Sequence, residues 1–99
     1  MRVTSFIADN AKLDAYYNPR TLETYIIVET PDGSIKINFK NGQQLAMFIR
    51  FSSQLLASLM RKAGKSREEI IDAVQHHAEA GASEILYDMP VQTTLEGMR

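Results

Sequence analysis

Polar and positively charged side chains that could bind an anion recur near the middle of the chain. Lys36, Asn38 and Lys40 stand at alternate positions, so a strand there places all three on one face. Asn41 and Gly42 follow at the expected start of a long helix, whose free N–H groups and dipole favour a phosphate. Helix capping by Asn41 explains the same two residues without a ligand. Both interpretations stay open at this point.

Tyrosines and a further cation precede this segment. Tyr16, Tyr17 and Tyr25 could stack a nucleobase, or they could cover the predicted sheet. Arg20 follows Pro19 in a segment that interrupts the strands. These residue types fit a ligand that combines an aromatic ring with phosphate groups.

Charge is distributed unevenly along the 99 residues. Residues 1–63 carry eight Lys or Arg against five Asp or Glu, whereas residues 64–99 carry three against seven. The first part could therefore attract an anion, although scattered surface charge accounts for the same numbers. The net charge of −1 argues against general binding to long nucleic acids.

Catalytic and metal-binding constellations are not evident. The chain has no cysteine, which excludes disulfides, a thiolate nucleophile and cysteine zinc sites. Asp72 and His76 are four residues apart and could face one metal ion, but the sequence offers no third ligand. The adjacent His77 points about 100° away from His76 around the helix axis, so the two histidines cannot easily bind the same ion. No serine lies in a nucleophile elbow. We therefore expect a protein that is not an enzyme and has no catalytic residue, metal or cofactor.

Hydrophobic periodicity and turn signals predict an α+β fold, an antiparallel sheet of about four strands packed on one long and one shorter helix. The turn Pro31-Asp32-Gly33-Ser34 joins two of the strands, with Gly33 able to accept a positive φ. Ser66 and Glu69 match a capping box at the start of the second helix, which we expect to fade near Gly81. The expected strands cover residues 2–8, 13–17, 22–30 and 34–40, the long helix covers 43–63, and a short strand-like piece covers 84–87. A single domain over residues 1–90 and a tail over 91–99 complete the expected organisation.

The long helix is apolar on two sides. One stripe runs from Leu45 to Met60 at spacings of three and four, and a second includes Met47 and Phe51. One sheet cannot cover both stripes, so we expect a homo-oligomer, a dimer or larger. Arg50, at the centre of the helix, makes it too polar to span a bilayer. The N-terminus has no apolar stretch of signal-peptide length, and we expect a cytoplasmic protein with no membrane partner.

Short motifs in this order resemble the TSCPD-type domain, a small domain associated with ribonucleotide reductases. They fall within residues 19–75, and the cysteines common in that family are absent. The matching segments are Pro19-Arg20-Thr21-Leu22, Tyr25-Ile26-Ile27-Val28, Phe39-Lys40-Asn41-Gly42, Leu55 to Arg61, and Glu68-Glu69-Ile70-Ile71.

The resemblance implies a stand-alone form similar to the phage anti-Thoeris sponges. Those proteins sequester cyclic ADP-ribose signals and other cyclic nucleotides as dimers or hexamers. For this chain it implies a non-enzymatic immune-evasion protein that holds a small nucleotide in the host cytoplasm. The alternative is an accessory or regulatory protein-interaction domain related to ribonucleotide reductase. The expected ligand-binding residues are Tyr17, Arg20, Lys36, Asn38, Lys40, Asn41 and Arg50.

Overall fold

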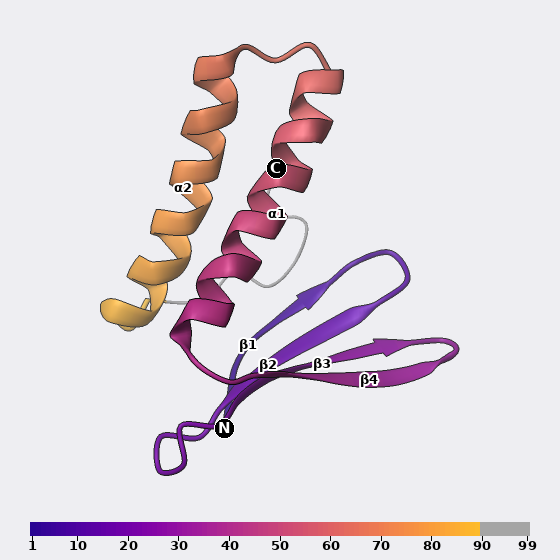
Figure 1. Cartoon of the computed structure of the whole chain (residues 1–99), viewed down its shortest axis with the longest axis vertical. Helices are drawn as coiled ribbons and strands as arrows, with labels where there is room; N and C mark the ends of the chain where they lie inside the picture. The colour runs from indigo at the N-terminus through magenta and orange to yellow at the C-terminus, as the bar shows by residue number, and fades with distance from the viewer. Residues whose placement is uncertain (90–99) are drawn as a thin grey trace. The chain divides into compact units, whose positions relative to one another are not determined.

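The computed structural model describes residues 1–89 and shows two units, a four-stranded sheet within residues 1–42 and a pair of helices from residue 43 onward (Figure 1). The α+β class, with four antiparallel strands and two helices, is confirmed. The expected tail over 91–99 lies outside the described residues. The elements are β1 Arg2–Ile7, β2 Lys12–Tyr17, β3 Thr24–Thr30, β4 Gly33–Phe39, α1 Gly42–Lys62 and α2 Arg67–Leu86.

The four strands form an antiparallel meander in the order β1-β2-β3-β4. Tyr16 stands opposite Tyr25, and Tyr25 stands opposite Asn38. Because side chains alternate along each strand, this register separates polar from apolar residues. The polar face carries Arg2, Lys12, Asp14, Tyr16, Tyr25, Ile27, Lys36 and Asn38. The apolar face carries Phe6, Leu13, Ala15, Tyr17, Ile26, Val28, Ile35, Ile37 and Phe39.

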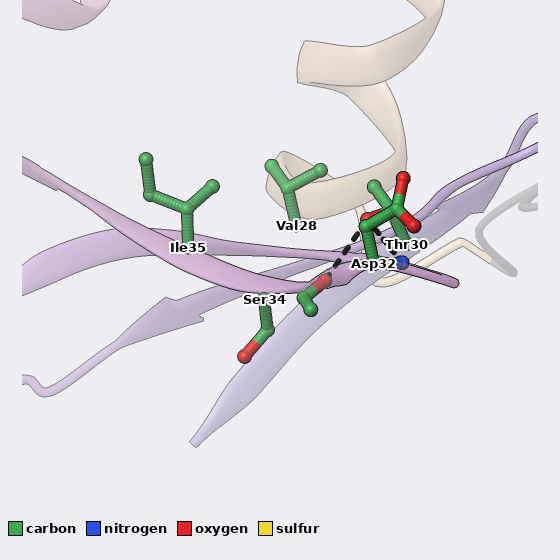
Figure 2. A pocket seen from close by; sticks show the side chains of 6 residues that line it. Val28, Thr30, Asp32, Ser34 and Ile35 are labelled. Atoms are coloured by element: carbon green, nitrogen blue, oxygen red, sulfur yellow. Dashed lines mark hydrogen bonds between the residues drawn. The ribbon is translucent and has the colours of Figure 1, made fainter.

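A two-residue turn fixes the register of β3 and β4. Thr30 pairs with Gly33, whose φ of 138° suits a residue without a side chain. The Thr30 hydroxyl donates to the Gly33 carbonyl at 3.0 Å and accepts from the Asp32 N–H at 3.3 Å. Figure 2 shows Val28 and Ile35 on one side of this hairpin and Ser34 on the other. The predicted turn and its alternation are therefore confirmed.

An irregularity in β1 determines where Arg2 lies. Thr4 pairs with Ala15, but Arg2 pairs with Tyr16, so the register shifts by one residue between them. Without that shift Arg2 would share the face of Thr4 and Ala15. The extra residue turns Arg2 onto the polar face instead, as β-bulges commonly do.

The helices run antiparallel and are joined by a short turn (Figure 1). Ser66 caps α2: its hydroxyl accepts from the Glu69 N–H at 3.1 Å, and the Glu69 carboxylate accepts from the Ser66 N–H at 3.1 Å. The predicted capping box is thus confirmed. The expected strand over 84–87 is wrong, because α2 continues through Gly81 to Leu86.

Each helix has one half-buried side, which includes Leu56 and Met60 on α1 and Ile70 and Val74 on α2. A cavity of about 260 Å³ is lined by α1 residues and by Ile70, so the two helices adjoin near the turn. Among the helices of residues 1–89, none has an apolar stretch of the length needed to cross a bilayer.

The described residues contain no buried apolar side chain. The polar face of the sheet, in contrast, carries a buried carboxylate: Asp14 has only 4% of its surface exposed. A chain of about this size normally buries an apolar core of its own.

Candidate ligand site on the polar face of the sheet

Two tyrosines from neighbouring strands form an aromatic pair on the polar face. The register places Tyr16 of β2 directly opposite Tyr25 of β3. Their ring centroids lie 5.0 Å apart and the ring planes differ by 13°, so the rings are stacked. Both residues are half-buried. A stacked pair of this kind offers an aromatic surface to a planar ligand.

Lys36 of β4 lies against the same pair. Its ammonium nitrogen is 4.1 Å from the centroid of the Tyr25 ring and 3.1 Å from a carboxylate oxygen of Glu23. Because β3 lies between β2 and β4, Lys36 reaches Tyr25 from the side opposite to Tyr16. Nearly half of the side chains of both Lys36 and Glu23 is exposed to solvent. Water therefore screens this ion pair, and Lys36 can exchange one partner for another at small cost.

Asn38 extends the row formed by the two tyrosines. It stands opposite Tyr25, and Arg2 stands opposite Tyr16 at the other end of the row. The polar face thus presents a guanidinium, two stacked rings and an amide side by side across the four strands. Such a row combines stacking with charge and with hydrogen-bond donors and acceptors.

A buried carboxylate lies next to this row. Asp14 Oδ1 is 3.7 Å from Arg2 Nη1, and Asp14 Oδ2 is 3.7 Å from Lys12 Nζ. Both distances exceed hydrogen-bond length, and Oδ1 has no hydrogen-bond partner. Two nearby cations therefore compensate part of the negative charge of Asp14, but neither of them donates a hydrogen bond to its carboxylate.

The structure brings together some of the predicted site residues. Lys36 and Asn38 share the polar face of β4, as expected. Tyr17 lies on the apolar face, where it pairs with Thr24. The structure does not bring Tyr17 to Lys36; Tyr16 and Tyr25 take that position.

The other predicted site residues lie outside the row. Arg20 belongs to the turn between β2 and β3, where its N–H donates to Asn18 Oδ1 at 2.9 Å. Lys40 and Asn41 follow β4 and precede α1, whose first residue is Gly42. Arg50 lies within α1, in the helical unit, and is exposed.

The expected set of site residues included Tyr17 but not Tyr16, Tyr25 or Asp14, although the sequence also allowed Tyr16 and Tyr25 to stack a base. The signal for the tyrosines was present, because the alternation of Leu13 and Tyr17 against Asp14 and Tyr16 assigns them to opposite faces. The burial of Asp14 had no such signal, since it depends on Arg2 and on the irregularity in β1.

In the described part of the chain, no three His, Asp or Glu side chains gather in a way that could hold a metal ion. Comparison with known proteins found no family model, no curated protein and no solved structure that matches this chain.

Proposed function

We propose that this chain is a non-enzymatic protein that binds and sequesters a small nucleotide signal as a homo-oligomer. The observation that supports this function best is the stacked Tyr16–Tyr25 pair with Lys36 at its outer face. A nucleotide combines a flat base with phosphates, and the row offers rings for the base and a cation for a phosphate.

Binding would replace contacts that the free protein makes. A base that stacks on the outer face of Tyr25 takes the place of the Lys36 ammonium. Lys36 then leaves Glu23 and pairs with a phosphate, while Asn38 can hydrogen-bond the edge of the base or the ribose. The exposed position of the Lys36–Glu23 pair keeps the cost of this exchange low.

The nature of the signal comes from the resemblance rather than from the geometry. A cyclic ADP-ribose type molecule or a cyclic oligonucleotide is the proposed ligand, and evasion of a nucleotide-based immune response in the host cytoplasm is the proposed role. Sequestration needs tight binding and an unchanged ligand. Stoichiometric capture of a ribonucleotide reductase subunit without any bound nucleotide would favour the accessory-domain alternative.

Calorimetric titration of the purified chain with cyclic ADP-ribose and with cyclic di-AMP tests the proposal. Replacing Tyr25 by Leu keeps an apolar side chain on β3 but removes the ring, and we expect affinity to fall about 5- to 150-fold, from roughly 1–3 kcal/mol per stacked base. Tyr17→Leu is the matched control, since Tyr17 lies on the other face. Glu23→Gln should tighten binding, because Lys36 loses its competing partner.

Two results would contradict the proposal. Recovery of a hydrolysed nucleotide after denaturation would show that the protein is an enzyme. Equal losses of affinity in Tyr25→Leu and Tyr17→Leu, with both variants folded by circular dichroism, would remove the polar face from the site.

A further inference from the structure

The outer side of α2 carries an exposed apolar stripe, distinct from its half-buried side. Its members recur at spacings of seven, four and three, which places them within an arc of about 60° on a helix of 3.6 residues per turn. All four are exposed to solvent. The stripe consists of Ile71, Ala78, Ala82 and Ile85 and extends about 21 Å along the helix axis.

This stripe is complementary to itself. Ile71 and Ile85 are each seven residues from Ala78, so an antiparallel copy centred on Ala78 brings Ile71 of one chain to Ile85 of the other. The same arrangement places Ala78 against Ala78, where small side chains permit close approach of the two backbones. A repeat of seven residues keeps such a contact continuous along both helices.

Charge distinguishes the antiparallel arrangement from the parallel one. Arg67 lies one turn before Ile71 on the stripe, and Asp88 follows three residues after Ile85. An antiparallel copy brings Arg67 of each chain toward Asp88 of the other. A parallel copy would bring like charges together at both ends, which is unfavourable.

A cavity lies where the stripe begins. It has a volume of about 320 Å³ and is lined by Arg61, Lys65, Arg67, Ile70 and Ile71. None of its three cations forms a salt bridge with another residue of the described chain. The opposite end of α2 presents matching chemistry, with Leu86 and Tyr87 about three-quarters exposed beside Asp88.

We propose that α2 packs antiparallel against α2 of a second copy of this chain, with the Leu86–Asp88 end of each copy seated on the cation-lined cavity of the other. The contact is isologous, so both cavities are occupied in a closed dimer. The proposal rests on the homo-oligomer included in the proposed function and does not depend on the nucleotide.

The exposed stripe of α1 does not offer the same match. It is formed by Phe48, Phe51, Leu55 and Leu59. The charged residues of α1 are Arg50, Arg61 and Lys62, and the helix has no acidic residue. A second α1 would therefore supply no opposite charge, whereas the two ends of the α2 stripe differ in sign, with Arg67 at one end and Asp88 just beyond the other.

Disulfide cross-linking tests the contact directly, because the natural chain has no cysteine. Under a mild oxidant, Ala78→Cys should form a covalent dimer, since the two-fold axis brings the introduced thiols together. Asp72→Cys is the matched control: Asp72 is exposed on the same helix but lies about 110° from the centre of the stripe. Equal cross-linking of the two variants would overturn the proposal.

The direction of the helices has its own test. Neither Ile71→Cys nor Ile85→Cys should cross-link alone, whereas a refolded mixture of the two should. Cross-linking of Ile71→Cys with itself would indicate a parallel pair and contradict the proposed arrangement.

Light scattering separates this proposal from the homo-oligomer on which it rests. The natural chain should have at least twice the chain mass of 11.2 kDa, and Ala78→Glu should reduce the mass to that of one chain. A natural chain of 11.2 kDa would refute the oligomer itself. An oligomer that persists in Ala78→Glu and lacks the Ala78→Cys cross-link would leave the oligomer standing and overturn the α2 contact. A natural chain that forms stoichiometric complexes with an acidic amphipathic helix of another protein, in place of itself, would overturn it as well.

Discussion

The buried carboxylate of Asp14 provides a quantitative test of the sheet. Its side chain is 5% exposed and lies 3.7 Å from each of two cations, Arg2 and Lys12, which are about half exposed. We expect the double change Arg2→Met with Lys12→Met to destabilise the protein, because it leaves a buried negative charge without compensation. Methionine keeps the unbranched apolar stem of both side chains, so the change removes mainly charge.

Coulomb's law sets the size of the effect. At 3.7 Å each pair contributes about 1 kcal/mol in water and about 4.5 kcal/mol at an effective dielectric constant of 20. Solvent screens Arg2 and Lys12, which favours the lower part of that range, about 1–2 kcal/mol per cation. The double variant should therefore lose about 2–4 kcal/mol, close to the cost of leaving a buried charge unpaired.

Adding Asp14→Asn to the double variant distinguishes charge from packing. If the loss comes from an uncompensated carboxylate, neutralising it should restore more than half of the lost stability. Urea denaturation followed by circular dichroism at pH 7 and one fixed protein concentration measures all variants. Lys36→Met, which breaks the exposed pair with Glu23, is the control and should cost less than about 1 kcal/mol. A triple variant that is less stable than the double variant would refute the reasoning.

Two further predictions concern local structure. Ser66→Ala should destabilise α2 by about 0.5–2 kcal/mol in urea denaturation, because it removes the hydroxyl that accepts from the Glu69 N–H. The hydrogen bond from the Ser66 backbone N–H, and after it the one with the Ser66 side chain, lower the pKa of Glu69. Its stabilising contribution is therefore complete above its ordinary pKa of about 4.5 and is lost as pH falls through the lower folded value. Glu69→Gln, which does not titrate, should flatten this acid dependence, and an unchanged profile would contradict the assignment. Gly33→Ala should cost about 1–3 kcal/mol through its φ of 138° alone, since a Cβ there meets no atom within 4 Å. Gly42→Ala, also in open space but without a positive φ, is its control, and equal costs at the two sites would show that backbone strain is not the cause.

Local signals in the sequence were sufficient for most of the elements. Alternation from Thr24 to Thr30 and from Ile35 to Phe39 separates the two faces of β3 and β4, and the turn chemistry of Pro31 to Gly33 fixes their pairing. The capping box at Ser66 likewise needs four consecutive residues and nothing distant. In each case the physical cause lies within one element or one turn, which a single sequence reveals.

The end of α2 shows where local signals mislead. Gly81 costs about 1 kcal/mol in a helix relative to alanine, and it suggested an early end to this helix. The residues around it include Ala80, Ala82, Glu84 and Leu86, which are good helix formers. Their summed preference outweighs one glycine, so the helix continues to Leu86. The prediction failed because one residue was weighted above its neighbours.

The candidate site depended on distant relations that a single sequence does not contain. Lys36 meets Tyr25 and Glu23 through the pairing of β3 with β4, and Asp14 meets Arg2 through the register shift in β1. A change of one residue in either register would place these side chains on opposite faces. The residue types of the site and the faces of its tyrosines were therefore predictable, whereas the contacts of Lys36 and the burial of the Asp14 carboxylate were not.

The two proposals concern different residues, which makes their relation testable. The ligand row contains Tyr16, Tyr25 and Lys36 on the sheet, whereas the proposed subunit contact centres on Ala78 of α2. If each copy binds its nucleotide alone, Ala78→Glu should halve the mass and leave the affinity unchanged. If that variant becomes monomeric and also loses the nucleotide, a second copy must complete the site. Tyr25→Leu is the converse control in both cases, because a change confined to the sheet should lower affinity without altering the mass of the oligomer.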